Sequence, residues 1–255
     1  MDWSDHGIVL GLRRHGETSV IAELLTARHG RHLGLVRGGV GRRLRGVLQP
    51  GNEVALRWRA RLSEHLGSFT IELERARAAA LMADPGALAA LTSVCALASL
   101  ALPERQPHAA LFEATRRLLD VLEASAGAPT HWASAYVHWE IQLLTEIGFG
   151  LDLGCCAVTG RTTGLAYVSP RTGRAVCAEA AGPYVDRLLV LPAFLWDLRA
   201  APPTPKDIRA GLELTGFFLS HHMLAPHDKA LPPARLRLSD RIADTSAISC
   251  GGRAN

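Results

Sequence analysis

Residues 54–74 read VALRWRARLSEHLGSFTIELE. In the first part apolar residues alternate with arginines: Val54, Leu56, Trp58 and Ala60 against Arg57, Arg59 and Arg61. In the last part Phe69, Ile71 and Leu73 alternate with Thr70, Glu72 and Glu74. A period of two places apolar side chains on one face of a β-strand and polar ones on the other. The stretch therefore predicts two strands that share a buried face.

Three more apolar runs precede this stretch, at residues 7–13 (GIVLGLR), 19–26 (SVIAELLT) and 31–36 (RHLGLV). Turn residues separate them, including Gly16-Glu17 and the later Pro50-Gly51-Asn52. Five short strands in so few residues favour a small closed barrel of the OB type, since a β-sandwich needs about seven. We therefore expect an OB-type nucleic-acid-binding domain over residues 1–78.

A basic segment lies between these strands: residues 28–45 read RHGRHLGLVRGGVGRRLR, with six arginines, five glycines and no carboxylate. Arginine keeps its charge at ordinary pH, and its planar fork matches phosphate oxygens. We interpret the end of this segment as a flexible, glycine-flanked loop that carries Arg42, Arg43 and Arg45. A solvated basic loop without any partner remains the alternative.

The positive charge of the chain is concentrated near its N-terminus. The first 80 residues hold 13 arginines against 8 acidic residues, whereas the other 175 hold 15 basic and 16 acidic residues. This asymmetry is typical of proteins that contact nucleic acid or an acidic surface. The N-terminal MDWSDHGIV has no signal-peptide pattern and no run is apolar enough for a membrane span, so we expect a cytoplasmic, globular protein.

Residues 79–255 are expected to form a helical domain, which makes the whole chain an α+β protein. Helical periodicity runs from about residue 76 to 148, broken at Pro85-Gly86. It predicts a core stripe of Trp132, Tyr136, Trp139, Leu143 and Ile147. Thr204-Pro205 carries the signals of a helix start. Between these helices, residues 150–182 are rich in glycine and cysteine and predict a hairpin near 167–173.

No pattern of catalytic residues is found. The chain lacks a phosphate-binding G-x-x-x-x-G-K-[ST] loop, a G-x-S-x-G elbow and an H-E-x-x-H helix, so we do not expect an enzyme. Glu140 and Glu146 read as acids on the polar face of a helix, without partners for acid–base work. His221, His222, His227 and Asp228 could bind a metal, but a solvated helix end is the favoured interpretation.

The five cysteines, at 95, 155, 156, 177 and 250, are odd in number and irregular in spacing, which argues against a disulfide framework. A structural zinc site usually has two C-x-x-C knuckles. Here Cys156 is followed three positions later by Thr159, and Cys177 by Ala180. Cys155 could supply one further sulfur. We interpret these cysteines as packed free thiols and expect no cofactor, with zinc as the less favoured alternative.

The order of these motifs resembles that of the bacterial DNA repair protein RecO family. Gly7-Ile8-Val9-Leu10, Gly16-Glu17, the segment from His29-Gly30 to Val36-Arg37-Gly38-Gly39, and Leu48-Gln49-Pro50-Gly51 occur in the family's order. Residues 165–176, LAYVSPRTGRAV, resemble its cysteine-bearing hairpin. The family's zinc cysteines would fall at 156, 159, 177 and 180, so this chain has the degenerate form of a zinc-finger-like insertion.

The resemblance implies a recombination mediator that binds single- and double-stranded DNA and anneals complementary strands. It implies contacts with RecR and with the acidic tail of single-strand binding protein, help in loading the RecA recombinase, and a place at the nucleoid. The expected DNA-binding residues are Arg31, Arg37, Arg42, Arg43, Arg45, Arg57 and Arg59. The first eighty residues contain only three Trp, Tyr or Phe residues, Trp3, Trp58 and Phe69. We therefore expect electrostatic contacts to contribute more to DNA binding than base stacking does.

Two other classes of function fit the same pattern. An OB domain could bind structured RNA, in which case single strands of RNA and DNA would bind equally well. Alternatively, the helical part could be a scaffold that docks acidic peptides, in which case DNA binding would be absent even at low salt.

Overall fold

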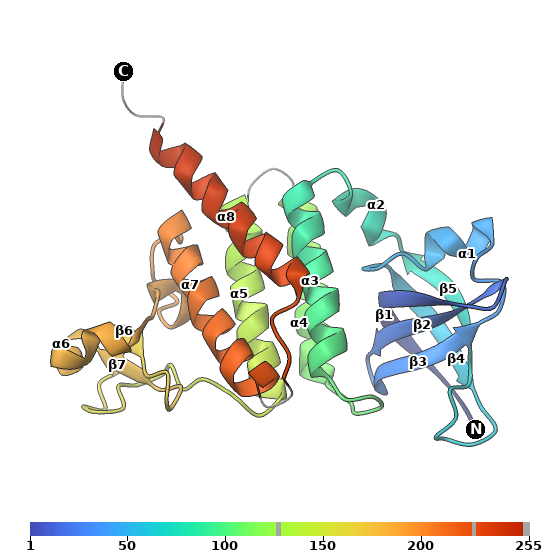
Figure 1. Cartoon of the computed structure of the whole chain (residues 1–255), viewed down its shortest axis with the longest axis horizontal. Coiled ribbons are helices and arrows are strands. Elements are labelled where there is room, and N and C mark those ends of the chain that lie inside the picture. The colour runs from blue at the N-terminus through green and yellow to red at the C-terminus, as the bar shows by residue number, and fades with distance from the viewer. Residues whose placement is uncertain (126–128, 226–227, 252–255) are drawn as a thin grey trace. The chain divides into compact units, whose positions relative to one another are not determined.

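The computed structural model describes residues 1–125, 129–225 and 228–251 (Figure 1). The chain divides into two compact units, Met1–Ala126 and Gly127–Asn255. The first holds five strands with four helices, and the second holds helices and a small sheet among its described residues. A mixed α+β architecture, with an N-terminal five-stranded sheet before a helical region, is as the sequence predicts.

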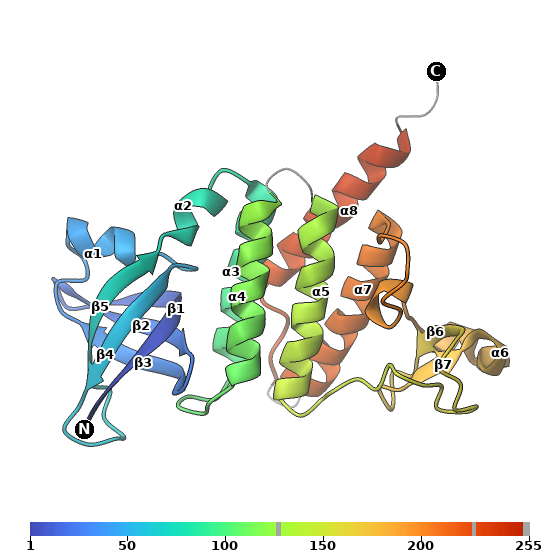
Figure 2. The same cartoon turned by 180° about the vertical axis from the view of Figure 1, so that it is seen from behind.

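The first unit is built on a closed barrel in the strand order β1-β2-β3-β5-β4. Its strands are β1 (Asp2–His15), β2 (Ser19–Thr26), β3 (Gly30–Val36), β4 (Glu53–Arg59) and β5 (Ser68–Arg75). All neighbours are antiparallel except β3 and β5, which meet in a parallel pair at Leu35 and Ser68 (Figures 1 and 2). This is the five-stranded arrangement expected of an OB-type barrel.

The alternation in the sequence sets the inside of the barrel. Val54, Leu56 and Trp58 are buried in its core together with Phe69 and Ile71. Closure between β3 and β5 needs a glycine, because a Cβ on Gly34 would lie 2.5 Å from the Phe69 ring. The expectation that Leu73 shares this buried face is wrong, since its side chain is largely exposed near the end of β5.

The segment after β3 is not the flexible loop expected from its glycines. Residues Arg42–Val47 form a short helix, α1, whose Leu44 and Val47 pack against the barrel core. The buried Asn52 side chain donates to the Gly46 and Val47 carbonyls at 2.9 and 3.0 Å and so fixes the helix end. A helix forms here despite the neighbouring glycines, because Arg and Leu are good helix formers and because this tertiary packing stabilises the helix.

Three helices complete the first unit: α2 (Arg77–Leu81), α3 (Pro85–Ala101) and α4 (Ala109–Ala124). The break predicted at Pro85-Gly86 is the start of α3, where the Asp84 carboxylate accepts from the backbone N–H of Gly86 and Ala87. Pro85 occupies the first helical turn, where a missing N–H costs nothing. These helices therefore belong to the same compact unit as the barrel, α3 packing against β1.

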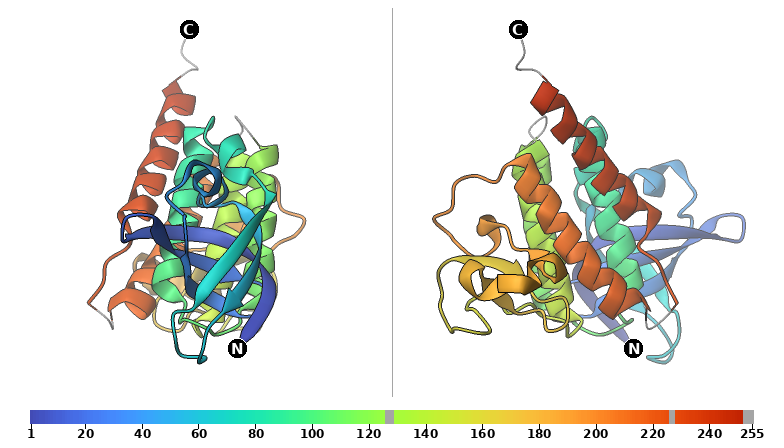
Figure 3. Two further views of the ribbon diagram at one scale, coloured as in Figure 1. Left: turned by 90° about the vertical axis from the view of Figure 1, so that its right-hand side faces the viewer. Right: turned by 60° about the vertical axis from the view of Figure 1, so that its left-hand side comes forward.

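The second unit contains α5 (Pro129–Glu146), α7 (Pro205–Phe218), the π-helix η3 (Leu219–Leu224) and α8 (Pro233–Gly251), with α7 packed on both α5 and α8 (Figure 3). Trp132, Tyr136, Trp139 and Leu143 are buried, so the aromatic stripe is core as predicted. Helix α7 begins with a capping box between Thr204 and Asp207, again as predicted. The interpretation of Glu140 as an acid on the polar face of a helix is wrong, because its carboxylate is fully buried and bound to Arg235.

Residues 150–204 contain a three-stranded sheet in the order β7-β6-β8. Strands β6 (Leu165–Val168) and β7 (Ala175–Cys177) form an antiparallel pair, joined by a turn in which Gly173 has a φ of +67°. Strand β8 (Leu189–Val190) adds to the other edge of β6. Short helical turns connect these elements: α6 (Ala178–Ala181), η1 (Gly182–Arg187) and η2 (Ala193–Leu195).

Candidate nucleic-acid interface

A basic groove opens on the barrel beside α1. It has a volume of about 730 Å³ and lies between the end of β3, α1 and β5. Val36, Leu44, Phe69 and Ile71 contribute its apolar lining, and Arg37, Arg43 and Arg59 its positive charge. Apolar walls with a few charged groups are the usual make-up of a ligand site, here with a charge that selects for anions.

Four arginines around this groove are exposed and lack an ion-pair partner within the described part of the chain. They are Arg37, Arg42, Arg43 and Arg45, all expected from the sequence. Because no carboxylate neutralises them, their positive charge is available to a polyanion. The structure thus gathers these four side chains at one end of the barrel, partly on α1.

Two further arginines, Arg13 and Arg14, lie at the same end of the barrel. They are not among the DNA-binding residues expected from the sequence. They lie exposed near the tip of the β1–β2 hairpin. The hairpin turn is joined to the segment after β3 by a hydrogen bond of 3.2 Å from the Val40 N–H to the Thr18 carbonyl. Arg14 pairs with Val20, which pairs with Val36 of the groove, so two strand spacings, about 10 Å, separate Arg14 from the groove.

The arginines of β4 are exposed, as their alternation predicts, but they have a partner. Asp2 of the neighbouring β1 forms an ion pair with Arg57 and lies 3.7 Å from Arg59. The hydrogen bond and the charge of Arg57, with a smaller contribution from Arg59, lower the pKa of Asp2 below its ordinary value. Arg59 is still 72% exposed and lines the groove, so its charge is shared between Asp2 and the groove.

Arg31 is placed differently from the other expected residues. Its guanidinium lies 2.6 Å from the Glu23 carboxylate and 3.8 Å from that of Glu104, and it donates to the Leu102 carbonyl at 2.7 Å. Its side chain is only 15% exposed. These contacts hold β3 to β2 and to the segment between α3 and α4, which favours a structural role for Arg31.

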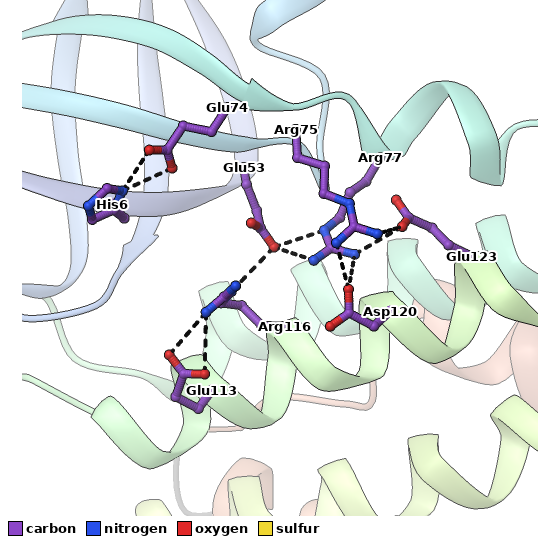
Figure 4. A network of polar contacts seen from close by, with 9 residues as sticks. All are labelled: His6, Glu53, Glu74, Arg75, Arg77, Glu113, Arg116, Asp120 and Glu123. Carbon is purple, nitrogen blue, oxygen red and sulfur yellow. Dashed lines mark hydrogen bonds and ion pairs between the residues drawn. The ribbon is translucent and has the colours of Figure 1, made fainter.

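At the other end of β4 and β5, arginines are neutralised within the fold (Figure 4). Arg77 is fully buried and contacts Glu53, Asp120 and Glu123, while Arg75 pairs with the latter two and Arg116 with Glu53 and Glu113. Burial raises the pKa of Asp120, but the hydrogen bond and charge of Arg77 outweigh it and leave this pKa low. This network attaches the barrel to α4 and leaves little free charge there.

The cysteine region brings Cys156 and Cys177 together, while Thr159 and Ala180 stand at the other two positions of the knuckle pattern. The Thr159 hydroxyl lies 3.6 Å from the Cys177 sulfur, and the Cys156 sulfur accepts the Cys177 N–H at 3.3 Å. Burial opposes ionisation of Cys156, but hydrogen bonds from Thr159 and from backbone N–H groups lower its pKa to about 6. Thr159 and Ala180 offer no sulfur. Across residues 1–125, 129–225 and 228–251, no three His, Cys, Asp or Glu side chains gather as metal ligands.

The described histidines after α7 lie against aromatic rings. His221 stacks on Phe217 at 4.0 Å between ring centroids, and His222 on Phe218 at 5.5 Å. Asp228 follows in a turn, whereas His227 lies outside the described residues. The described histidines thus pack against the aromatic residues one turn earlier.

Known families match nearly the whole chain. The family model described as Recombination protein O N terminal covers residues 1–77, and that described as Recombination protein O C terminal covers residues 82–232. The chain belongs to the RecO family. It is 52% identical over 248 residues to the DNA repair protein RecO of Rhodospirillum rubrum, with 97% of this chain and 98% of the relative covered.

Other RecO proteins are similarly close. That of Rhodospirillum centenum is 55% identical over 251 residues, covering 98% of each chain. That of Jannaschia sp. is 53% identical over 244 residues, covering 95% of this chain and 96% of the relative. The resemblance read from the motifs is therefore confirmed. The RecO N-terminal model ends just after β5, so it corresponds to the barrel that carries the basic groove.

Among the described residues, no helix has both the length and the apolar character needed to cross a bilayer.

Proposed function

We propose that this RecO-family chain acts in DNA repair and recombination as a mediator that binds single- and double-stranded DNA without sequence specificity. It anneals complementary strands and helps load the RecA recombinase, with RecR, on strands coated by single-strand binding protein. The observation that supports DNA binding is the cluster of unpaired arginines around the groove beside α1.

The physical basis is phosphate neutralisation. Arginines that replace counterions along a DNA backbone give an affinity that does not depend on sequence and falls steeply with salt. The groove holds Arg37, Arg43 and Arg59, and Arg42 and Arg45 lie on the same short helix as Arg43. A flexible strand could follow this end of the barrel from α1 to the β1–β2 hairpin, where Arg13 and Arg14 lie.

The test is a titration of the full chain with fluorescently labelled single-stranded DNA over a range of salt concentrations. We expect the double variant Arg42→Ala with Arg43→Ala to bind every sequence more weakly. Its slope of log affinity against log salt should be smaller by about 1.4, since each single-strand phosphate contact contributes roughly 0.7. Thermal stability should change little, because both side chains are exposed.

A matched control removes the same charge elsewhere: Arg117→Ala with Arg171→Ala, two exposed residues on α4 and in the β6–β7 turn. This control should keep the wild-type affinity and slope. Equal slopes for the wild type and the Arg42/Arg43 variant would show that α1 is only a solvated helix. Equal affinity for RNA and DNA single strands would favour the RNA-binding alternative, and no binding at low salt would favour a protein-interaction scaffold.

A further inference from the structure

An aromatic column runs from the barrel core to its surface. Trp58 is buried in the core, and its ring lies 5.5 Å from that of Trp3, at an angle of 20°. On Trp3 stacks the imidazole of His29, with centroids 3.8 Å apart and planes within 6°. His29 lies in the turn between β2 and β3, so the outermost ring of this column is a histidine.

The His29 ring is fixed by hydrogen bonds. Its Nδ1 lies 2.8 Å from an oxygen of Asp5, and since a carboxylate accepts, Nδ1 carries the proton. Asp5 is buried and also accepts from the backbone N–H groups of His6 and Arg28, each at 2.9 Å. The His29 backbone N–H donates to the Thr26 hydroxyl at 3.1 Å. The ring is thus pre-organised, and ordering it costs little on binding.

The His29 ring is partly exposed. Trp3 covers one of its faces, and 32% of the side chain remains exposed. Next to it, the Arg28 side chain is 70% exposed while its guanidinium is anchored to Asp5 and to the Ser4 carbonyl. A flat, rigid and partly exposed ring of this kind matches one part of a nucleotide, a base that stacks.

We propose that His29 is a stacking platform for an unpaired nucleobase of a single-stranded nucleic acid, with Trp3 supporting it from below. This inference rests on the proposed DNA-binding function and adds a contact of another kind, because stacking involves the π-face of a base whereas the ion pairs of the arginines involve the phosphates. It selects single strands over duplex, whose bases are already stacked on one another. Every base has a π-face, so the contact remains tolerant of sequence.

The test uses the full chain and a labelled oligothymidine, with affinity measured at several salt concentrations. His29→Ala should lower the affinity on the order of tenfold, within the range found when stacking side chains are truncated. The salt slope should stay unchanged, because loss of stacking releases no counterion. His29→Phe should keep most of the affinity, since a phenyl ring can stack on Trp3 and on a base.

Two controls separate stacking from a structural effect. His221→Ala removes another exposed histidine that stacks on an aromatic ring, in the second unit, and should leave the affinity unchanged. A strand with an abasic segment should bind wild type and His29→Ala equally, because it offers no base to the ring. Thermal denaturation of each variant shows whether the barrel stays folded.

The proposal is overturned if folded His29→Ala binds oligothymidine like the wild type, if its loss is as large on the abasic strand, or if His29→Phe loses as much as His29→Ala. Failure of the wild type to bind any single strand would instead refute the proposed function, and this site with it. Binding by the wild type with an unaltered His29→Ala refutes only the stacking platform.

Discussion

The ion pair between Glu140 and Arg235 connects three helices of the second unit. Glu140 on α5 and Arg235 on α8 are both buried and meet through two hydrogen bonds, one of 2.9 Å. The Glu140 carboxylate also accepts from the hydroxyls of Tyr136 on α5 and Thr215 on α7. Arg235 donates in addition to the Leu212 carbonyl of α7 at 2.9 Å. Each charge is therefore matched, and the charge of Glu140 raises the pKa of Arg235 against the effect of burial.

Replacing Glu140 by Gln keeps the shape but leaves a buried guanidinium without its counter-charge. Breaking a buried pair in this way costs about 3–5 kcal/mol. A domain is typically stable by about 5–15 kcal/mol, so the loss is a large part of the total. In Glu140→Gln with Arg235→Met both charges are gone, and we expect at least about 2 kcal/mol of the loss to be recovered, because the unpaired charge causes most of it.

The assay is urea denaturation of the full chain, followed by tryptophan fluorescence, since Trp132 and Trp139 report on the second unit. The control is Glu213→Gln, whose carboxylate pairs with Arg209 at 2.9 Å on the surface of α7, both side chains being 64% exposed. This exposed pair should contribute at most about 0.5 kcal/mol. If Glu140→Gln costs no more than Glu213→Gln, the reasoning about the buried pair is wrong.

Two further predictions concern pH and zinc. Burial raises the pKa of Asp5, but hydrogen bonds from His29 and from backbone N–H groups outweigh it and lower that pKa. Ionised Asp5 therefore stabilises the folded protein at pH values above its ordinary pKa of about 3.9. This stabilisation is lost as the pH falls through the lower pKa of the folded state. Wild type should lose more stability than Asp5→Asn between pH 5 and pH 3 in urea midpoints, and an equal loss would contradict this. For zinc, we expect elemental analysis to find well below one ion per purified chain, because Thr159 and Ala180 cannot replace thiolates. The circular dichroism spectrum should stay unchanged in excess chelator. One zinc per chain, with unfolding on chelation, would show that other residues complete a site.

The barrel could be predicted because its determinants are local. The alternation of Val54, Leu56 and Trp58 with arginines is visible in seven residues, and β4 follows it. The start of helix α7 could likewise be predicted from two neighbouring residues, Thr204 and Pro205. Helix α1 was missed because its stability depends on contacts with Asn52 and the barrel core, which no window of six residues contains.

The candidate site could be predicted only in part, for a related reason. Arg42, Arg43 and Arg45 lie together in the sequence and in the structure, but Arg13 and Arg14 reach the same end of the barrel only through strand pairing. The burial of Glu140 could not be predicted because its partner, Arg235, is 95 residues away. The stacking of His29 on Trp3 could not be predicted because the two rings are brought together only by the fold of the barrel.

Charge counting from the sequence treats every arginine of the N-terminal third alike, and the fold separates them into two kinds. Arg28, Arg31, Arg57, Arg59, Arg75 and Arg77 each lie beside a carboxylate, which fixes them in the structure. Seven others have no such partner among the described residues: Arg61, which follows β4, and six that lie toward the β1–β2 hairpin and α1, namely Arg13, Arg14, Arg37, Arg42, Arg43 and Arg45. Because a carboxylate at contact distance cancels most of an arginine's field at a distance, the potential that attracts a polyanion comes mainly from the second group. A net charge of a few units in the sequence is thus compatible with a strong local field at one end of the barrel, which is where we expect the phosphates to bind.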